Sequence, residues 1–528
     1  MSNKKIKINF YQIGVFFIFF FAVFLRFYRI NDRWSVDYDP ARDSMVAREA
    51  LRLKNIPQIG AFSSAGPFVW GPIYFWFIML SYAIAPNFIF APWVLYTIVD
   101  LIHILVMIKI GKISWGEKGG LILGLITAIS TGMLFRASLV NQPTLVPVCG
   151  SLVILTFLLY AKTKKPLYLL LMGMSIGWAL NNHFQALNYL FFAPLIILLT
   201  EKTKIKKVFI SSLSFLIGLI IPLLPLAYWD YHMGWKNIKN VLDYFLIGQY
   251  RLWVSNRWLI YAGQYWPKLW SSVIGGNLIY GYLFIGLIIV FLITQLIAKK
   301  LPKTIFGLAT VFGILLVLNR YYRGERFEGY MVYFYPLIIY FSGYVIVSLI
   351  KLNKMLAVTF LIPLLFFTLK ADLRLIKNQM DPNNPRPIIN KLVKELKVLR
   401  PKEKFKIYDD RYLSPTPSMM TSFFLSFANL IDEKNGTILG FSTQDNLPYP
   451  KLTEVNGILQ QTNIYDLTSF WSKKEFDQQR WINVSPKFVC LDILEWWKVK
   501  EFKSTFCLTC FTKEKLTAGI KLMQIRKE

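Results

Sequence analysis

Long runs of apolar residues alternate with short polar segments from residue 11 to residue 369. The runs are continuous, and several approach the roughly 20 residues that an α-helix needs to cross a bilayer. Only helices and closed barrels satisfy their backbone polar groups in lipid, and continuous apolar runs favour helices. The pattern therefore predicts about eleven spanning helices. They are expected at residues 11–30, 89–110, 120–135, 145–160, 167–182, 189–199, 208–228, 274–296, 305–318, 330–350 and 356–369.

Another apolar segment, residues 71–85, is expected to lie along the membrane surface instead of crossing it. Trp70, Tyr74, Trp76 and Tyr82 would anchor this segment, because aromatic side chains favour the bilayer interface. The first apolar run could be a signal peptide, but it has no small-residue cleavage site before Arg26. A membrane anchor is therefore the favoured interpretation of that run.

The pattern changes after residue 370 to short alternating runs with helical segments between them. Such runs predict strands, and their mixture with helices predicts a small α/β domain. We therefore expect a transmembrane domain at residues 1–370 and a soluble domain at residues 371–528. The fold class predicted for the whole chain is a polytopic α-helical membrane protein with a small C-terminal α/β domain.

The formal net charge is +30, which in a soluble protein would indicate a nucleic-acid partner. Here the lysines gather in the polar segments that follow even-numbered predicted spans, so no nucleic acid is expected. Because lysine-rich loops favour the cytoplasmic side, the N-terminus should be cytoplasmic and the C-terminal domain outside. The predicted location is therefore the cell membrane, crossed many times.

Every arginine before Arg374 falls on the predicted outer side of the membrane. Guanidinium groups form two parallel hydrogen bonds with phosphate or carboxylate, which gives these arginines a possible role in phosphate binding. The alternative is that they pair with outer carboxylates or lipid headgroups. These arginines are Arg26, Arg29, Arg33, Arg42, Arg48, Arg52, Arg136, Arg251, Arg257, Arg320, Arg323 and Arg326.

The polar segment after the first span contains three acidic residues, Asp37, Asp39 and Asp43, together with Arg42. Pro40 fits the start of a helix with Asp39 as its N-cap, and the residues that follow form an amphipathic pattern. Carboxylates at the water–lipid boundary can act as a general base. Asp37 and Asp39 could instead hold a divalent cation, or the cluster could be a solvated cap with a salt bridge.

Polar residues also follow several other predicted spans on the same side, and together they would line a polar cavity. They are Asn141, His183, Asp230, Arg320, Arg323 and Arg326. Asp100 and His103 lie within a predicted span, where charge is costly. They stand three residues apart, and we expect a buried structural pair.

Two stretches carry a resemblance to a known family. The first runs from Asp39 through Arg42 and Asp43 to Glu49, and the second is Gly71-Pro72-Ile73-Tyr74-Phe75-Trp76. They resemble the two interfacial-helix motifs of GT-C membrane glycosyltransferases. The branch that looks most similar contains protein O-mannosyltransferases, the aminoarabinose transferase of lipid A and Rgt-type lipopolysaccharide transferases, which are of the glycosyltransferase family 39 type. The resemblance covers residues 10–370 in layout.

The resemblance implies that Asp39 is the catalytic base and that Arg42 contacts the lipid phosphate. It also makes residues 1–370 the catalytic domain. The chain departs from the family where Pro40 replaces a Glu and Trp70 replaces a Lys, so another cation must contact the phosphate. Asn141 stands about where the family often has an Asp, and an amide can only orient a substrate.

The function expected from these features is transfer of a sugar from a polyprenyl-phosphate donor on the outer leaflet. Asp39 would deprotonate the acceptor, and arginines would stabilise the leaving phosphate. The partners would be the lipid-linked sugar, membrane lipid, and a glycan, lipid or protein acceptor. A divalent cation is an optional cofactor. The rival classes are a transporter or lipid flippase, which would show internal inverted repeats, and a noncatalytic scaffold.

Overall fold

The computed structural model describes residues 9–61, 63, 68–201, 205–248, 257–322, 328–380, 390, 393–394, 396–398, 401–409, 416–432 and 437–441. The chain divides into two compact units, which are described separately. Unit 1 comprises Met1–Arg33, Trp93–Ala227 and Leu242–Gln379, and unit 2 comprises Trp34–Pro92, Tyr228–Val241 and Met380–Glu528. The domain boundary expected at residue 370 stays a prediction.

Unit 1 is built from helices. Its α-helices are α1 (Phe10–Phe27), α2 (Ile30–Arg33), α5 (Ala91–Ala128), α6 (Thr131–Ala137), α7 (Val146–Thr163), α8 (Pro166–Asn182), α9 (Phe192–Glu201), α10 (Ile205–Ile220), α13 (Arg257–Ile260), α14 (Trp266–Ile274), α15 (Leu278–Ile297), α16 (Lys303–Tyr321), α17 (Tyr335–Leu352) and α18 (Lys354–Gln379). Short 3-10 or π turns connect several of them: η1 (Gln142–Leu145), η2 (Phe184–Phe191), η3 (Ile221–Leu223), η4 (Tyr244–Gly248), η5 (Tyr261–Tyr265), η6 (Glu328–Tyr330) and η7 (Val332–Phe334). Helices α11 (Leu224–His232) and α12 (Lys236–Asp243) cross the unit boundaries, as does the first turn of α5.

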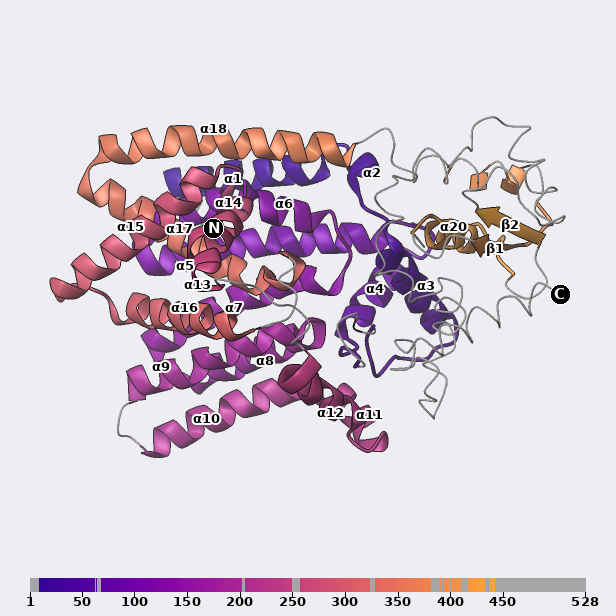
Figure 1. Cartoon of the computed structure of the whole chain (residues 1–528), viewed down its shortest axis with the longest axis horizontal. Coiled ribbons are helices and arrows are strands. Elements are labelled where there is room, and N and C mark those ends of the chain that lie inside the picture. The colour runs from indigo at the N-terminus through magenta and orange to yellow at the C-terminus, as the bar shows by residue number, and fades with distance from the viewer. Residues whose placement is uncertain are drawn as a thin grey trace, which may run out of the picture. The chain divides into compact units, whose positions relative to one another are not determined.

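The long helices of unit 1 run side by side, as Figure 1 shows for α7, α8 and α10. Glycines allow the backbones of α8 and α10 to approach closely. A Cβ atom at Gly218 would lie 2.0 Å from the Leu170 carbonyl oxygen, and one at Gly173 would lie 2.2 Å from that of Phe215. Small residues at such crossings are typical of helix packing in membranes, where dispersion contacts replace the hydrophobic effect.

Nine helices in the described part of the chain are long and apolar enough to cross a membrane. Two features account for the difference from the eleven expected. The 38-residue helix α5 contains two predicted spans, and its backbone leaves helical geometry at Trp115 and at Gly116, which has φ 74°. Helix α8 coincides with another predicted span but has 17 residues, roughly 25 Å of helix. Every predicted span thus coincides with a helix, and the number that cross a bilayer stays a prediction.

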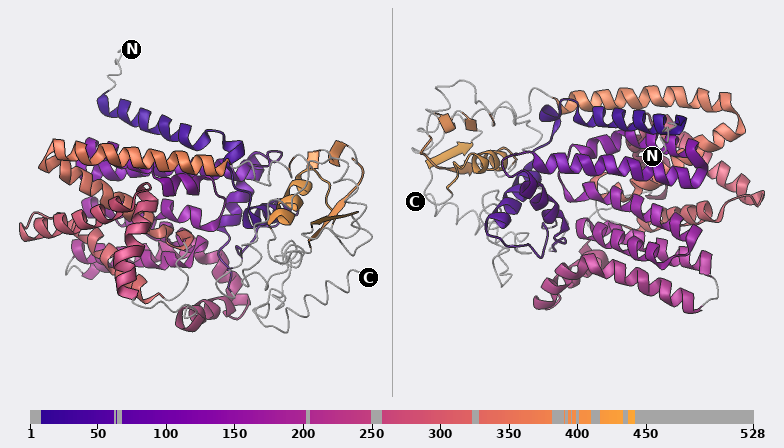
Figure 2. Two further views of the ribbon diagram at one scale, coloured as in Figure 1. Left: turned by 45° about the horizontal axis from the view of Figure 1, so that its top comes forward. Right: turned by 180° about the vertical axis from the view of Figure 1, so that it is seen from behind.

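The described part of unit 2 centres on three helices, α3 (Tyr38–Arg52), α4 (Ile73–Ile84) and α20 (Thr416–Phe427). Helix α3 packs against both α4 and α20, which Figure 2 shows from two further directions. Strands β1 (Phe405–Asp409) and β2 (Thr437–Phe441) pair in parallel, with Phe405 opposite Thr437. Both strands lie in the region after residue 370 where the alternating pattern predicts strands. The remaining strands expected after residue 441 lie outside the described residues, so the α/β domain stays a prediction.

Helix α4 corresponds to the segment expected at the membrane surface. With 12 residues, or about 18 Å, it is too short to span a bilayer. The prediction that its aromatic side chains anchor it in lipid is wrong for Trp70, Tyr74 and Tyr82, which are buried inside the protein. The helix uses these rings to pack against its neighbours in unit 2. The composition of a single helix could not reveal this, because the same rings suit a protein core and a membrane interface.

Candidate active site

The acidic cluster lies at the start of α3. The helix begins at Tyr38, with Asp37 as the N-cap residue in extended conformation (φ −84°, ψ −175°), so the expected cap at Asp39 is displaced by two residues. The Asp37 carboxylate does not cap the helix and accepts a hydrogen bond of 2.5 Å from Ser35 Oγ. Asp39 is therefore in the first helical turn, where the helix dipole favours negative charge.

Arg42 joins two carboxylates of α3. Its Nη1 lies 2.8 Å from Asp39 Oδ1, and its Nε lies 2.7 Å from Asp43 Oδ1. The two carboxylates differ sharply in environment, since the Asp39 side chain is 57% exposed and that of Asp43 is 0% exposed. The cluster thus presents one carboxylate to solvent and keeps the other inside the protein.

Burial raises the pKa of Asp43 to about 6, although the charge of Arg42 and hydrogen bonds from Arg42 and Tyr74 act in the opposite direction. Burial also lowers the pKa of Arg42, but the carboxylates of Asp43 and Asp39 outweigh it and hold that pKa well above its usual value. Arg42 therefore carries its charge permanently, and this charge limits the rise in the pKa of Asp43.

The second motif of the sequence meets the first one here. Tyr74, in the first turn of α4, is fully buried and hydrogen-bonds to Asp43. The backbone before α4 folds back on itself, with hydrogen bonds from Gly60 N to Trp70 O and from Trp70 N to Ala61 O. A Cβ atom at Gly60 would lie 2.1 Å from the Gly71 carbonyl oxygen, so only glycine fits. The sequence pattern predicted Tyr74 at the membrane surface, and nothing in it indicated this contact with Asp43.

Asp230 also belongs to unit 2, but it caps a helix. Its two carboxylate oxygens accept hydrogen bonds from Asn237 N (2.7 Å) and Ile238 N (2.9 Å) at the start of α12. The Asn237 side chain forms two hydrogen bonds with the backbone of Val69. Its Oδ1 accepts from Val69 N, and its Nδ2 donates to the Val69 carbonyl oxygen. Asp230 therefore holds α12 against the segment before α4.

The other expected site residues of the described chain lie in unit 1. Asn141 caps η1 and accepts from Thr144 Oγ1 at 2.7 Å. His183 ends α8 and is buried with its ring stacked against Phe184, and burial together with the Arg136 charge lowers its pKa to about 3. Arg320 is in the last turn of α16. Arg323 and Arg326 lie outside the described residues.

Several of the arginines considered for phosphate binding pair within the protein instead. Arg29 pairs with Asp32 at 2.8 Å, and Arg52 pairs with Glu49 at 2.6 Å. For these two arginines, the alternative to phosphate binding, which is pairing with a nearby carboxylate, is therefore the one observed.

Arg26 belongs to a buried network. Its Nε lies 2.5 Å from Asp100 Oδ2, and its Nη1 donates to the Ala128 carbonyl at 2.7 Å. The expected pair of Asp100 with His103 is present at 3.8 Å, and His103 also hydrogen-bonds to Ser151 at 2.6 Å. Arg26, which the sequence placed among the phosphate-binding candidates, is therefore the main partner of Asp100.

No group of three or more His, Cys, Asp or Glu side chains in the described residues could hold a metal ion. Asp37 and Asp39 provide two carboxylates that stand two positions apart in the sequence. A divalent cation bound by this pair would need water molecules as its other ligands. A divalent cation at this pair stays a prediction.

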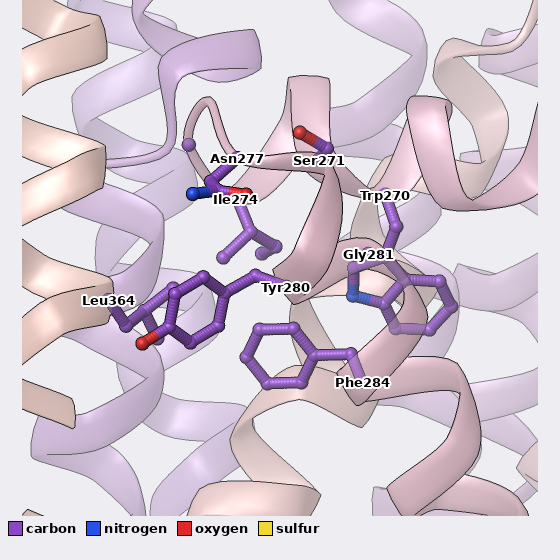
Figure 3. Close-up of a pocket in the computed structure, with 9 residues that line it drawn as sticks. Trp270, Ser271, Ile274, Asn277, Tyr280, Gly281, Phe284 and Leu364 are labelled. Carbon is purple, nitrogen blue, oxygen red and sulfur yellow. The ribbon is translucent and has the colours of Figure 1, made fainter. Parts of the chain in front are cut away.

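A small pocket of about 150 Å³ opens elsewhere, in unit 1, between α14, α15 and α18. Figure 3 shows that aromatic side chains, Trp270, Tyr280 and Phe284, make much of its lining. This volume includes space that is open to solvent, and the recess has almost no room for a water molecule. We assign it no part in the candidate site.

Comparison with solved structures identifies the fold. ArnT from Cupriavidus metallidurans in the apo state is 13% identical, with a TM-score of 0.52 covering 87% of this chain and 89% of that one. The same protein bound to undecaprenyl phosphate gives a TM-score of 0.51 with the same identity and coverage. The Archaeoglobus fulgidus oligosaccharyltransferase is 11% identical, with a TM-score of 0.48 over 84% of this chain. This chain spans 62% of the length of that oligosaccharyltransferase.

The apolar helices and the likeness to ArnT indicate a multi-pass membrane protein whose helical fold is similar to that of ArnT. More particularly, the family model for dolichyl-phosphate-mannose-protein mannosyltransferases matches residues 67–229. No curated protein sequence matches the chain. The resemblance to GT-C membrane glycosyltransferases predicted from the sequence is therefore confirmed.

Proposed function

We propose that this protein is a membrane glycosyltransferase that moves a sugar from a polyprenyl-phosphate donor to a hydroxyl or amine of a lipid, glycan or protein. The observation that carries the proposal is the position of Asp39. Its carboxylate is 57% exposed, stands at the start of α3, and is held by Arg42. An accessible carboxylate fixed by an arginine is suited to accept a proton from an acceptor.

The chemistry would be a single displacement at the anomeric carbon of the sugar. The acceptor oxygen or nitrogen forms a bond to that carbon while its proton passes to Asp39. The bond from the anomeric carbon to the phosphate oxygen breaks at the same time, and its electron pair leaves with the polyprenyl phosphate. Attack opposite the leaving group inverts the configuration. Cationic side chains would stabilise the charge that develops on the phosphate.

Arg42 and Asp43 would act as positioning residues in this scheme. Arg42 Nη1 fixes the Asp39 carboxylate at 2.8 Å, and its Nε is fixed in turn by Asp43 at 2.7 Å. Asp43 is fully buried, so an acceptor cannot reach it without a rearrangement of the protein. A base held within hydrogen-bond distance of its orienting group loses less entropy in reaching the reactive geometry.

The comparisons support the class of donor. The description of the matching family model names dolichyl-phosphate-mannose, and one of the similar ArnT structures contains undecaprenyl phosphate. Both lipids are polyprenyl phosphates. The distribution of lysines supports a reaction on the outer face of the membrane.

The test compares Asp39→Asn with the wild-type protein in membranes that contain a radiolabelled undecaprenyl-phosphate-linked sugar. We expect the variant to lose roughly 10²–10⁴-fold in release of the labelled sugar from the donor, because a positioned base contributes about that much. Glu49→Gln is the matched control, since Glu49 is another carboxylate of α3 that pairs with an arginine. It should retain activity.

Two results would contradict the proposal. Equal turnover by Asp39→Asn and wild type would exclude Asp39 as the base. Failure of the wild-type protein to consume any polyprenyl-phosphate-linked sugar, while mass spectrometry finds no such lipid bound to it, would exclude this class of donor.

A further inference from the structure

Arg136 is a buried cation without a counter-charge in the described chain. It lies in the last turn of α6 and is 3% exposed. Its Nε has no hydrogen-bond partner among the residues that the structure describes. None of the ion pairs found between those residues includes it. Its guanidinium carbon lies 5.5 Å from the centre of the Phe135 ring, a contact that does not neutralise the charge. A buried charge without a counter-ion is strongly unfavourable, so this position suits an anion.

Two other arginines of unit 1 show how the protein compensates a buried guanidinium elsewhere. Arg26 and Arg33 are buried to the same extent as Arg136. Arg26 is paired with Asp100, and Arg33 donates to the Leu25 carbonyl (2.6 Å) and to Gln379 Oε1 (2.9 Å). Arg136 differs from both because the described residues provide it with no such acceptor.

The environment of Arg136 includes the side chain of His183. Burial and the charge of Arg136 lower the pKa of His183, so the imidazole is neutral. His183 Nδ1 accepts a hydrogen bond from Gln185 N at 3.3 Å, which assigns the ring proton to Nε2. The centre of the His183 ring lies 5.0 Å from that of Phe184 and 5.1 Å from that of Tyr330, so both rings contact it. A guanidinium and a fixed imidazole N–H are both donors that suit an anion.

Both residues come directly after predicted spans, at residues 120–135 and 167–182. Residues at the ends of spanning helices lie at the depth of lipid headgroups. The anion expected at this depth is a lipid phosphate, and the planar guanidinium matches phosphate geometry better than a lysine would. Arg42, in contrast, already contacts two carboxylates.

We infer that Arg136 and His183 form a binding site for the phosphate group of the polyprenyl-phosphate lipid. This inference rests on the proposed function. The lipid phosphate would supply the missing counter-charge of Arg136. His183 Nε2–H would donate a further hydrogen bond to a phosphate oxygen.

The experiment measures thermal unfolding of the purified full-length protein with undecaprenyl phosphate, with undecaprenol and with phosphatidylglycerol. We expect only undecaprenyl phosphate to raise the Tm of the wild-type protein substantially, through mass action. Arg136→Gln should weaken its apparent affinity about 10- to 100-fold, the range for lost charge-assisted hydrogen bonds. Arg136→Lys should be intermediate.

Arg33→Gln is the matched control, because it removes a buried arginine whose guanidinium donates hydrogen bonds to oxygen atoms of the protein. It should lower the Tm of the lipid-free protein and leave the affinity for undecaprenyl phosphate unchanged. Arg136→Gln should show the opposite behaviour, with a lipid-free Tm equal to or above that of wild type. This opposite sign separates a ligand-binding cation from a structural one.

Four outcomes would overturn the inference. Unchanged affinity in Arg136→Gln would remove Arg136 from the site and leave the proposed function standing. A lipid-free Tm lowered as much as in Arg33→Gln would show that Arg136 has a partner inside the protein. Equal stabilisation by phosphatidylglycerol would identify a general headgroup contact. Absence of any wild-type response to undecaprenyl phosphate would count against the proposed donor as well.

Discussion

The guanidinium carbon of Arg48 lies 3.5 Å from the centre of the Phe427 ring. Arg48 is on α3, and Phe427 is the last residue of α20, so this contact ties a C-terminal helix to the helix that carries Asp39. Arg48 Nη1 also donates to Ser426 Oγ at 3.4 Å, and the Tyr82 ring of α4 lies 5.5 Å from that of Phe427. Three segments far apart in the sequence thus meet around one aromatic ring.

Replacement of Phe427 tests this contact. Phe427→Ala removes a cation–π interaction and an aromatic contact, and we expect it to cost about 1–3 kcal/mol of stability. Sugar transfer should also fall, because α3 would lose one of its supports. Phe427→Tyr keeps the ring and should restore both properties. Unfolding curves and transfer rates check the prediction, and a stable, fully active Phe427→Ala would contradict it.

The buried carboxyl of Asp43 predicts a dependence of stability on pH. Its pKa is raised to about 6 in the folded protein. An unfolded Asp has a pKa of about 3.9, so the folded state binds this proton more tightly. The contribution of Asp43 to stability is therefore highest below about pH 4, falls as pH rises to about 6, and is constant above that.

Asp43→Asn cannot ionise and isolates this effect. The difference in unfolding free energy between the variant and wild type should move in favour of the variant as pH rises from about 4 to about 6. Denaturation at a series of pH values measures it. A difference that does not change with pH would show that the carboxyl does not titrate in this window.

The Arg26–Asp100 pair predicts strong coupling between two buried charges. Arg26→Gln and Asp100→Asn should each cost about 3–5 kcal/mol, because each leaves an uncompensated charge inside the protein. The double variant should cost less than the sum of the two single variants. A double-mutant cycle of unfolding free energies measures the coupling, and additive costs would indicate that the charges are compensated separately.

We predict that Asp230 stabilises the folded protein. Asp230→Ala removes the acceptor of two backbone N–H groups at the start of α12 and should cost about 1–2 kcal/mol. Asp230→Ser can still cap the helix and should recover most of that stability. If Asp230→Ser instead keeps its stability and loses substrate affinity, the residue contacts substrate, as the sequence led us to expect.

Cysteine labelling tests the predicted orientation. Asn55 and Lys118 are both exposed, and they lie in segments predicted to be on opposite sides of the membrane. A membrane-impermeant maleimide added to intact cells should label Asn55→Cys and should not label Lys118→Cys. Permeabilised cells serve as the control, in which both positions should react. The reverse pattern would invert the topology and remove the active site from the outer face.

Local features of the sequence were sufficient to predict the helices. Each apolar run between residues 11 and 369 coincides with a helix, because a helix satisfies its backbone within its own segment. The break in α5 at Gly116 falls in a polar stretch between two predicted spans. The acidic cluster of α3 and the short helix after Gly71 were predictable for the same reason.

Roles that depend on neighbours distant in the sequence were not predictable. Asp39 and Asp43 stand four positions apart on one helix, yet packing against Tyr74 of α4 buries only Asp43. The arginines predicted on the outer side look equivalent in the sequence. In the structure Arg26 is paired with Asp100, Arg33 is hydrogen-bonded to carbonyl and amide oxygens, and Arg136 Nε has no hydrogen-bond partner among the described residues.

The sequence alone therefore determined which segments are helical and which residue types gather near the ends of the spans. Only the tertiary structure decided which carboxylate is exposed, which guanidinium is compensated and which aromatic ring is buried. The physical reason is that helix formation depends on contacts within a few residues, whereas burial and charge compensation depend on side chains that the folded chain brings together.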